Sequence, residues 1–143
     1  MSDPYNLQRF IDAQDGVFET AVAELRAGSK NSHWMWFIFP QLRGLGLSPT
    51  AQYYAIVSLA EARAYLNHPL LGPRLRACVE AVLPWRGRLS AEQILGPIDA
   101  LKLRSSLTLF GQLGPGGPFA AGLAAFFGGA RDERTLALLN AQR

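Results

Sequence analysis

The sequence contains little cysteine and histidine and no long apolar run, and each shortage excludes a class of protein. Cys78 is the one cysteine in 143 residues, which excludes an internal disulfide framework and a cysteine-rich zinc site. His33 and His68 lack the H-x-x-x-H spacing of metal ligands, so we expect no metal and no cofactor. No segment reaches the roughly 18 apolar residues that span a membrane, and residues 1–10 lack the apolar region of a secretory signal. We therefore expect a cytoplasmic protein without membrane contacts.

Lysine is also scarce. The chain contains two lysines, Lys30 and Lys102, and twelve arginines, and its net charge is +3. The arginines are scattered from Arg9 to Arg143, whereas nucleic-acid-binding proteins gather basic residues on one face or tail. The sequence therefore argues against RNA or DNA binding, which would also weaken steeply with salt. Codon preference for arginine explains the bias, yet a lysine that survives such a bias becomes a candidate for a chemical role.

The remaining composition favours a packed helical domain, with 49% hydrophobic and 17% charged residues. Capping residues, prolines and four-residue apolar spacing predict helices along most of the chain. We expect them over residues 3–10, 15–27, 48–54, 58–65, 69–83, 100–110, 119–127 and 132–139, and residues 90–93 fit a further capping box. Residues 34–39 are aromatic and short, and without a second such run to pair with we favour a buried helix or extended segment. The predicted fold is all-α, a compact multihelical single domain over residues 1–143 with few or no strands.

The segment SHWMWFIFPQ is the most unusual part of the chain. Its aromatic residues include Trp34 and Trp36, and the polar residues Ser32, His33 and Gln41 flank them. Such a block can stack a base or nicotinamide ring while the polar groups orient it. Core packing is the simpler explanation and is favoured for the aromatic residues. Ser32 and His33 are not needed for packing, so for these two we favour a ligand site.

A second candidate site lies on the helix expected over residues 100–110. Asp99, Lys102 and Ser106 share one helical face, with Ser105 adjacent. One acid, one lysine and two hydroxyls can bind a phosphate or ribose and supply a general base. A solvated face with one ordinary ion pair explains the pattern equally well.

A glycine-containing loop precedes the expected helix at residues 48–54. Gly44 and Gly46 leave backbone N–H groups free to seat an anion, and Arg43 stands at the mouth of this loop. Tyr54 follows this loop, and its spacing from Glu61 places the two residues in helical register. Glu61 fits the capping box S-x-x-E that begins at Ser58, which explains this carboxylate without chemistry.

These motifs together resemble a bacterial family, the domain of unknown function family 1810, whose members often carry the label calpastatin. The resemblance begins with SHWMWFIFPQL at residues 32–42 and extends over most of the chain. It continues at residues 44–46, 54–56, 61–62, 68–69, 71–72, 74–75, 102–103, 105–106 and 108–110, and ends with Gly129, Asp132 and the dipeptide Thr135-Leu136. It implies a small, mainly helical domain and brings no established activity. The label itself conflicts with the composition, because an inhibitor segment of the calpastatin type is polar and disordered.

A fainter resemblance is to the NADAR group, helical domains associated with NAD-derived and ADP-ribose substrates. That group also places an aromatic segment, a tyrosine-bearing helix and a later lysine-phenylalanine segment in this order. A glutamate stands just before its tyrosine-bearing motif, and Gln52 stands near that position here.

Two hypotheses about function follow, and the sequence leaves open whether the protein is an enzyme. In the first, the protein binds or hydrolyses a nucleotide or ADP-ribose-like ligand. Its residues would act in three roles: stacking by Trp34 or Trp36, phosphate binding by Arg43, Lys102 and the Gly44–Gly46 backbone, and proton transfer by His33 and Asp99. In the second, the protein is a non-enzymatic interaction module, either a monomer with a partner or a homodimer.

Overall fold

In the computed structural model, residues 2–142 form ten α-helices and one short 3-10 helix. In chain order these are α1 (Gln8–Gln14), α2 (Phe18–Ala27), α3 (Met35–Ile38), α4 (Pro49–Tyr53), α5 (Leu59–Asn67), α6 (Leu71–Val82), η1 (Leu83–Trp85), α7 (Ala91–Leu95), α8 (Pro97–Gly111), α9 (Phe119–Phe127) and α10 (Glu133–Ala141). No strand occurs in this part of the chain, where one parallel bridge joins Leu42 to Ile56. The all-α prediction is confirmed. None of the helices over residues 2–142 is long and apolar enough to cross a membrane.

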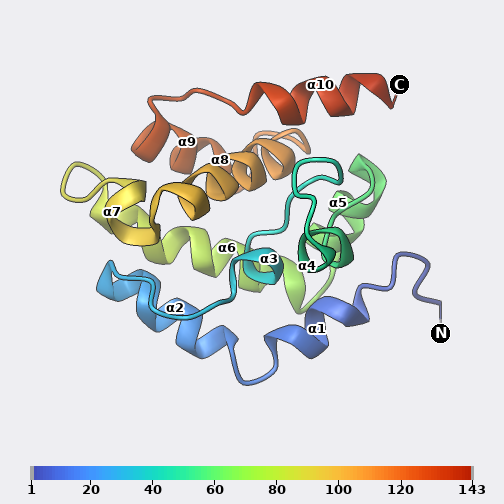
Figure 1. Cartoon of the computed structure of the whole chain (residues 1–143), viewed down its shortest axis with the longest axis horizontal. Coiled ribbons are helices and arrows are strands. Elements are labelled where there is room, and N and C mark those ends of the chain that lie inside the picture. The colour runs from blue at the N-terminus through green and yellow to red at the C-terminus, as the bar shows by residue number, and fades with distance from the viewer. Residues whose placement is uncertain (1, 143) are drawn as a thin grey trace.

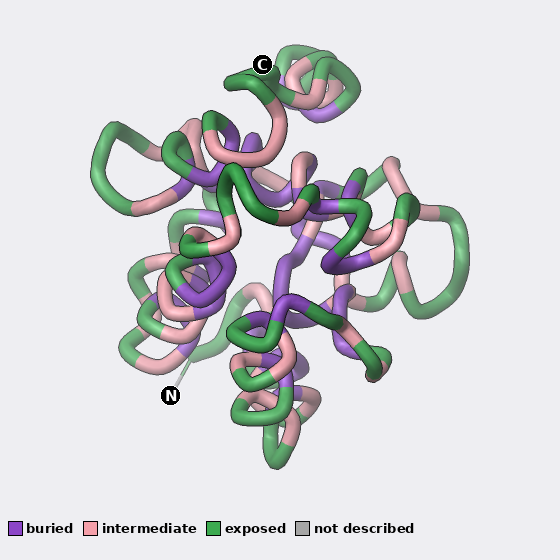
Figure 2. The backbone as a smooth tube through the Cα atoms, turned by 90° about the vertical axis from the view of Figure 1, so that its left-hand side faces the viewer, coloured by how far each residue is buried: buried purple, intermediate pink, exposed green. Residues whose placement is uncertain are grey.

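Two helices organise the molecule. α6 packs against α2, α5 and η1, and α8 packs against α5, α7, α9 and α10. Figure 1 shows α8, α9 and α10 along one side and α1 and α2 along the other, with α6 between them. Figure 2 shows that the buried residues lie toward the middle of the molecule, whereas the exposed residues lie on its outer side.

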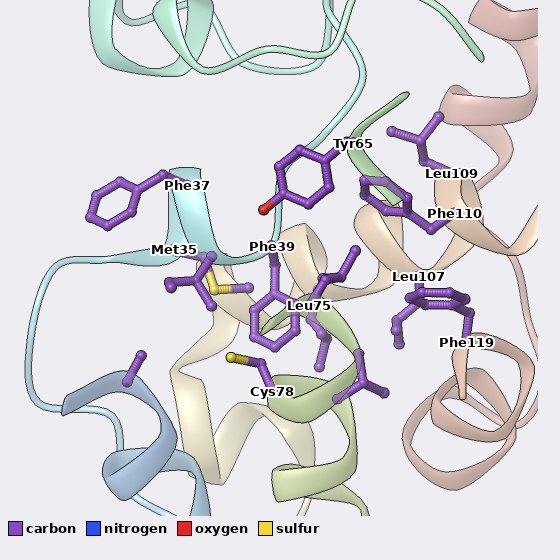
Figure 3. Packing of buried hydrophobic residues seen from close by; sticks show 14 of the residues in the cluster. Met35, Phe37, Phe39, Tyr65, Leu75, Cys78, Leu107, Leu109, Phe110 and Phe119 are labelled. Atoms are coloured by element: carbon purple, nitrogen blue, oxygen red, sulfur yellow. The ribbon is translucent and has the colours of Figure 1, made fainter. Parts of the chain in front are cut away.

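One continuous hydrophobic core joins the helices. Its largest fully buried side chains include Trp34, Tyr65, Phe39 and Phe110. Figure 3 shows side chains from α3, α5, α6, α8 and α9 meeting in this core. The aromatic segment at residues 34–39 is thus a buried single-turn helix with a short extension, one of the two alternatives that the sequence favoured.

Most of the predicted helix ends are confirmed. Side chains of Ser48, Ser58, Ser90 and Asp132 each accept a hydrogen bond from a backbone N–H in the first turn of the following helix. Ser90 also forms a complete capping box with Gln93. α2 ends at Gly28, whose φ of 72° is the left-handed conformation that glycine adopts without strain.

The predictions for the first two helices were wrong in detail. α1 begins at Gln8 rather than near Asp3, whose carboxylate instead accepts hydrogen bonds from the N–H groups of Leu7 and Gln8. Asp15 does not cap α2. It follows the end of α1, and the chain turns through Gly16 before α2 begins at Phe18.

The two halves of α8 differ in their surroundings. Every residue from Ser105 to Phe110 is buried, so this half is enclosed on all sides. The first half presents Ile98 and Leu101 to solvent and holds Asp99 and Lys102 at an intermediate depth. The predicted polar face of this helix therefore stops before Ser106, which lies in the core.

Candidate functional site

The two lysines of the chain meet at one carboxylate. Lys30 Nζ lies 2.9 Å from Asp99 Oδ2, and Lys102 Nζ lies 3.4 Å from Asp99 Oδ1. The Lys30 side chain is 9% exposed and that of Lys102 22% exposed. Two partly buried ammonium groups facing one carboxylate leave one positive charge in excess, so the cluster attracts anions.

Each of these lysines also lies over a tryptophan ring. Lys30 Nζ is 5.1 Å from a ring centroid of Trp34, and Lys102 Nζ is 5.0 Å from a ring centroid of Trp36. Both distances allow cation–π attraction, which fixes the position of the ammonium groups. The segment between Lys30 and Trp36 is thereby attached to the start of α8.

Glu24 on α2 organises the loop before Trp34. Its carboxylate accepts hydrogen bonds from the N–H groups of Asn31 and Ser32, from the hydroxyl of Ser32 and from the indole N–H of Trp34. Desolvation raises the pKa of Glu24, but these hydrogen bonds together outweigh it and leave the pKa below its ordinary value. The charged form of Glu24 therefore holds this loop in place.

Beside Lys102 lies a cleft of about 290 Å³, which we call the Lys102 cleft. It is bounded by the first half of α8, the start of α10 and the loop that follows α3. Its walls are formed by Gln41, Leu45, Gly46, Ile98, Leu101, Lys102, Arg104, Ser105, Asp132 and Arg134. The lining thus includes three cationic residues and one acidic residue, which gives it a net positive charge.

Hydrogen bonds between α8 and α10 keep the wall of the Lys102 cleft rigid. Asp132 Oδ2 accepts from the hydroxyl of Ser105 at 3.0 Å and from the backbone and hydroxyl of Thr135. The hydroxyl of Thr108 accepts from the Asp132 N–H at 2.8 Å. Arg104 donates to the carbonyl oxygens of Ala130 and Arg131. Asp132 Oδ2 is thus occupied by the cap of α10 and by Ser105.

The glycines of the loop before α4 have a steric role. A Cβ atom on Gly46 would come within 2.6 Å of the Cβ of Ala51, so the loop can pass α4 only with glycine at this position. Gly44 has a φ of 105° and lies against Leu138 of α10. The close approach of this loop brings Leu45 and Gly46 to the edge of the Lys102 cleft.

The structure brings part of the predicted site together. Gln41, Lys102 and Ser105 line the Lys102 cleft, while Asp99 and Trp36 contact Lys102. These residues come from two segments that are distant in sequence.

The other predicted residues lie outside the Lys102 cleft lining. His33 is exposed and makes no hydrogen bond or ion pair within residues 2–142, Ser32 is bound by Glu24, and Trp34 is fully buried. Gly44 lies in the same loop as the cleft residue Gly46. Ser106 Oγ is buried in the core without a hydrogen-bond partner among the described residues.

Arg43 and Tyr54 lie at or near a second hollow, of about 410 Å³, which Arg43 lines with Tyr53 and Val57. Tyr54 packs against Phe10 and Phe37. Burial raises its pKa, and the nearby Tyr53 adds to this effect.

A buried ion pair forms the floor of this second hollow. Arg9 Nη2 lies 2.7 Å from Glu61 Oε2, and Arg9 also donates to the carbonyl oxygens of Tyr5, Asn6, Tyr53 and Ala55. The other oxygen of Glu61 accepts from the Val57 N–H. Glu61 is therefore occupied by structure, although the predicted capping box is only half present: Ser58 caps α5 while Glu61 turns to Arg9.

The remaining nucleophiles and metal-ligand candidates have structural surroundings. Burial raises the pKa of the Cys78 thiol to about 12. His68 Nδ1 accepts from the N–H groups of Leu70 and Leu71 at the junction between α5 and α6. Residues 2–142 contain no group of three histidine, cysteine or acidic side chains placed to hold a metal ion.

Sequence reasoning missed four charged residues of this region, Lys30, Arg104, Asp132 and Arg134, and the apolar lining residues Ile98 and Leu101. Lys30 was visible as one of the two lysines, and Asp132 was identified only as a helix cap. Nothing in the local pattern distinguishes Arg104 or Arg134 from the other arginines. Their place in the cleft depends on how α8 and α10 pack.

Comparison with known proteins assigns the chain to a family. The model of the family described as "Protein of unknown function (DUF1810)" matches residues 4–139, so the chain belongs to this family. The structure is also similar to the crystal structure of the conserved hypothetical protein Rv1873 from Mycobacterium tuberculosis. The two are 55% identical with a TM-score of 0.93, over 96% of this chain and 99% of the other. A comparison with curated proteins returned no match. The resemblance to family 1810 is confirmed, and that to the NADAR group stays a prediction.

Proposed function

We propose that this protein binds a small phosphate-bearing ligand of the nucleotide type in the Lys102 cleft. The observation that carries the proposal is the convergence of Lys102, Arg104 and Arg134 on one cleft. Arginine and lysine side chains are the usual protein partners of phosphate oxygens. Asp132, the one carboxylate in the lining, is already engaged by Ser105 and Thr135.

The arrangement also supplies neutral contacts for the rest of such a ligand. Gln41 offers an amide that can donate and accept hydrogen bonds, and Ile98 and Leu101 offer apolar surface. A few polar groups beside apolar walls are typical of small-molecule sites. The cleft therefore suits an organic anion better than a simple ion.

The proposal concerns binding, and hydrolysis of the ligand stays a prediction. His33 is absent from the lining of the Lys102 cleft. Both carboxylate oxygens of Asp99 are already engaged by ammonium groups, and Asp99 does not line the cleft. Incubation of the protein with NAD or ADP-ribose, followed by chromatography of the products, tests turnover directly.

Isothermal titration calorimetry with AMP and ADP-ribose tests the proposed binding. We expect saturable heat with the wild-type protein and a loss of at least about tenfold in affinity for Lys102→Met or Arg134→Ala. Arg63→Ala is the matched control, because Arg63 is an exposed arginine on α5 outside the cleft lining. Absence of heat at millimolar ligand, or equal loss in the control, would refute the proposal.

The exposed apolar residues favour the second candidate function, an interaction or homodimerisation module. Leu47, Tyr53 and Val57 are exposed on and around α4, in addition to the two residues of the cleft. Exposed apolar groups that gather on one surface mark protein contacts. Light scattering after size-exclusion chromatography distinguishes a dimer from a monomer. A monomer at high micromolar concentration would contradict the homodimer.

A further inference from the structure

We infer that the ligand of the Lys102 cleft is a nucleoside monophosphate or a similar compound, in which one ring system accompanies one anionic group and covers Ile98 and Leu101. This inference rests on the proposed function and makes it more specific. It assigns the ring to two aliphatic side chains of α8 rather than to the tryptophans that the sequence suggested.

The first argument is the exposure of these two side chains within the cleft. Ile98 is 70% exposed and Leu101 is 63% exposed, and both line the Lys102 cleft. They stand three positions apart on α8, so their side chains are neighbours on the helix surface. A single exposed apolar residue is ordinary on a protein surface. Two neighbours in a cationic cleft form an apolar wall whose burial by a ring is favourable.

The second argument is that the tryptophans do not provide this surface. Trp34 is 0% exposed, and its indole N–H donates to Glu24 at 2.9 Å. Trp36 is partly exposed, but it lies beneath the Lys102 ammonium group and does not line the cleft. A ring that enters the cleft therefore meets Ile98 and Leu101 first.

The third argument is the distribution of charge around the cleft. Arg134 enters from α10, whereas Ile98 and Leu101 belong to the first turns of α8. Lys102 and Arg104 follow Leu101 on the same helix. One ligand can thus place an anionic group among the cations while its ring covers the apolar wall.

The size of the cleft matches a ligand with one such ring and one anionic group. Its volume of about 290 Å³ is at the small end of ligand pockets, which range over roughly 300–1,000 Å³. A dinucleotide has twice the rings and phosphates of a mononucleotide. It would extend well beyond this cleft, so we assign the mononucleotide class.

The experiment compares three ligands that share a phosphate group: inorganic phosphate, ribose 5-phosphate and AMP. Their affinities for the wild-type protein are measured by calorimetry at fixed ionic strength. We expect AMP to bind at least about tenfold more tightly than ribose 5-phosphate, because the base covers the apolar wall. Equal affinities for AMP and ribose 5-phosphate would overturn the inference and leave the proposed phosphate site intact.

A paired variant locates the ring. In Ile98→Gln/Leu101→Gln the affinity for AMP should fall to that for ribose 5-phosphate, and the latter should not change. Glutamine is a good helix former and both positions are exposed, so α8 is preserved. Leu47→Gln is the control, because Leu47 is 82% exposed and does not line the cleft. Unchanged AMP binding in the double variant would overturn the inference, whereas failure of all three ligands to bind the wild type would overturn the proposed function as well.

Discussion

Lys30 and Lys102 bind opposite oxygens of the Asp99 carboxylate, and only Lys102 lines the neighbouring cleft. The Lys30 contact is the shorter of the two. Asp99 would therefore keep a counter-ion if the Lys102 ammonium moved toward a phosphate group. This matters because a partly buried carboxylate left without its partner costs free energy. If Lys102 binds a phosphate group as we propose, Lys30 is the residue that keeps Asp99 paired.

The first prediction concerns Lys30 as a positioning residue. Lys30→Met should weaken the binding of AMP by about fivefold, because Asp99 would then retain Lys102 as its sole ammonium partner. Calorimetry measures this loss. In an Asp99→Asn background the same Lys30→Met change should have no further effect on affinity. An equal loss in both backgrounds would show that Lys30 acts only through general stability.

The second prediction compares two adjacent serines of α8. The Ser105 hydroxyl lies within hydrogen-bond distance of two acceptors, Asp132 Oδ2 and the Leu101 carbonyl, whereas Ser106 Oγ is buried without a partner among the described residues. Ser105→Ala should lower the free energy of unfolding by about 1–2 kcal/mol. Ser106→Ala should leave it unchanged or raise it by up to about 1 kcal/mol, because an unpaired buried hydroxyl is removed. Urea denaturation measures both, and the reverse order would contradict the described hydrogen bonds.

The third prediction is a pH dependence that comes from Glu24. Because its pKa is lowered in the folded protein, Glu24 stabilises the fold above the unfolded-state pKa, and this contribution is lost as the pH falls through the folded-state pKa. The Glu24→Gln variant should therefore lose less stability than the wild type as the pH falls through the carboxyl range. The unfolding temperatures of both proteins, measured from about pH 2.5 to about pH 7, test this difference, because carboxyl groups titrate within that range.

The Asp3 carboxylate also has a lowered pKa, from its hydrogen bonds with the N–H groups of Leu7 and Gln8. Its contribution is common to the wild type and the Glu24→Gln variant, so it cancels in the difference between them. Identical acid limbs in the two proteins would contradict the role assigned to Glu24.

The fourth prediction concerns the buried pair between Arg9 and Glu61. Glu61→Gln leaves the Arg9 guanidinium group buried without a counter-charge, and we expect the free energy of unfolding to fall by about 3–5 kcal/mol. Chemical denaturation measures the loss. Arg63→Met, an exposed change on the same helix, should alter stability by less than about 0.5 kcal/mol. A loss below about 1 kcal/mol for Glu61→Gln would contradict the structural role of the pair.

Local signals predicted the helices well, because caps and apolar spacing act within one or two turns. Ser48, Ser90 and Gly28 have the roles that the sequence assigns to them. Asp15 failed as a helix cap because Gly16 adds a turn between α1 and α2. A capping residue predicts a helix end only when the neighbouring backbone lets it form its local contacts.

The candidate site was predicted only in part, because its contacts connect distant segments. Lys102 could be identified from the scarcity of lysine, and its pairing with Asp99 is local to α8. The approach of Lys30 to the same carboxylate depends on the packing of α8 against the loop after α2. Arg9 and Glu61 are separated by 52 positions, and no pattern in either segment indicates the other. The burial of Trp34 agrees with the core packing that the sequence favoured for the aromatic residues, although aromatic side chains serve in cores and in ligand sites alike.

Chemical-shift mapping tests most directly whether the Lys102 cleft is the ligand site. Titration of ¹⁵N-labelled protein with AMP should shift the backbone amide signals of Gln41, Leu45, Lys102 and Arg134, and the shifts should saturate. The same titration of Lys102→Met should require a much higher AMP concentration. Shifts confined to the second hollow, around Arg43, Tyr53 and Val57, or no shifts at millimolar AMP, would contradict the account.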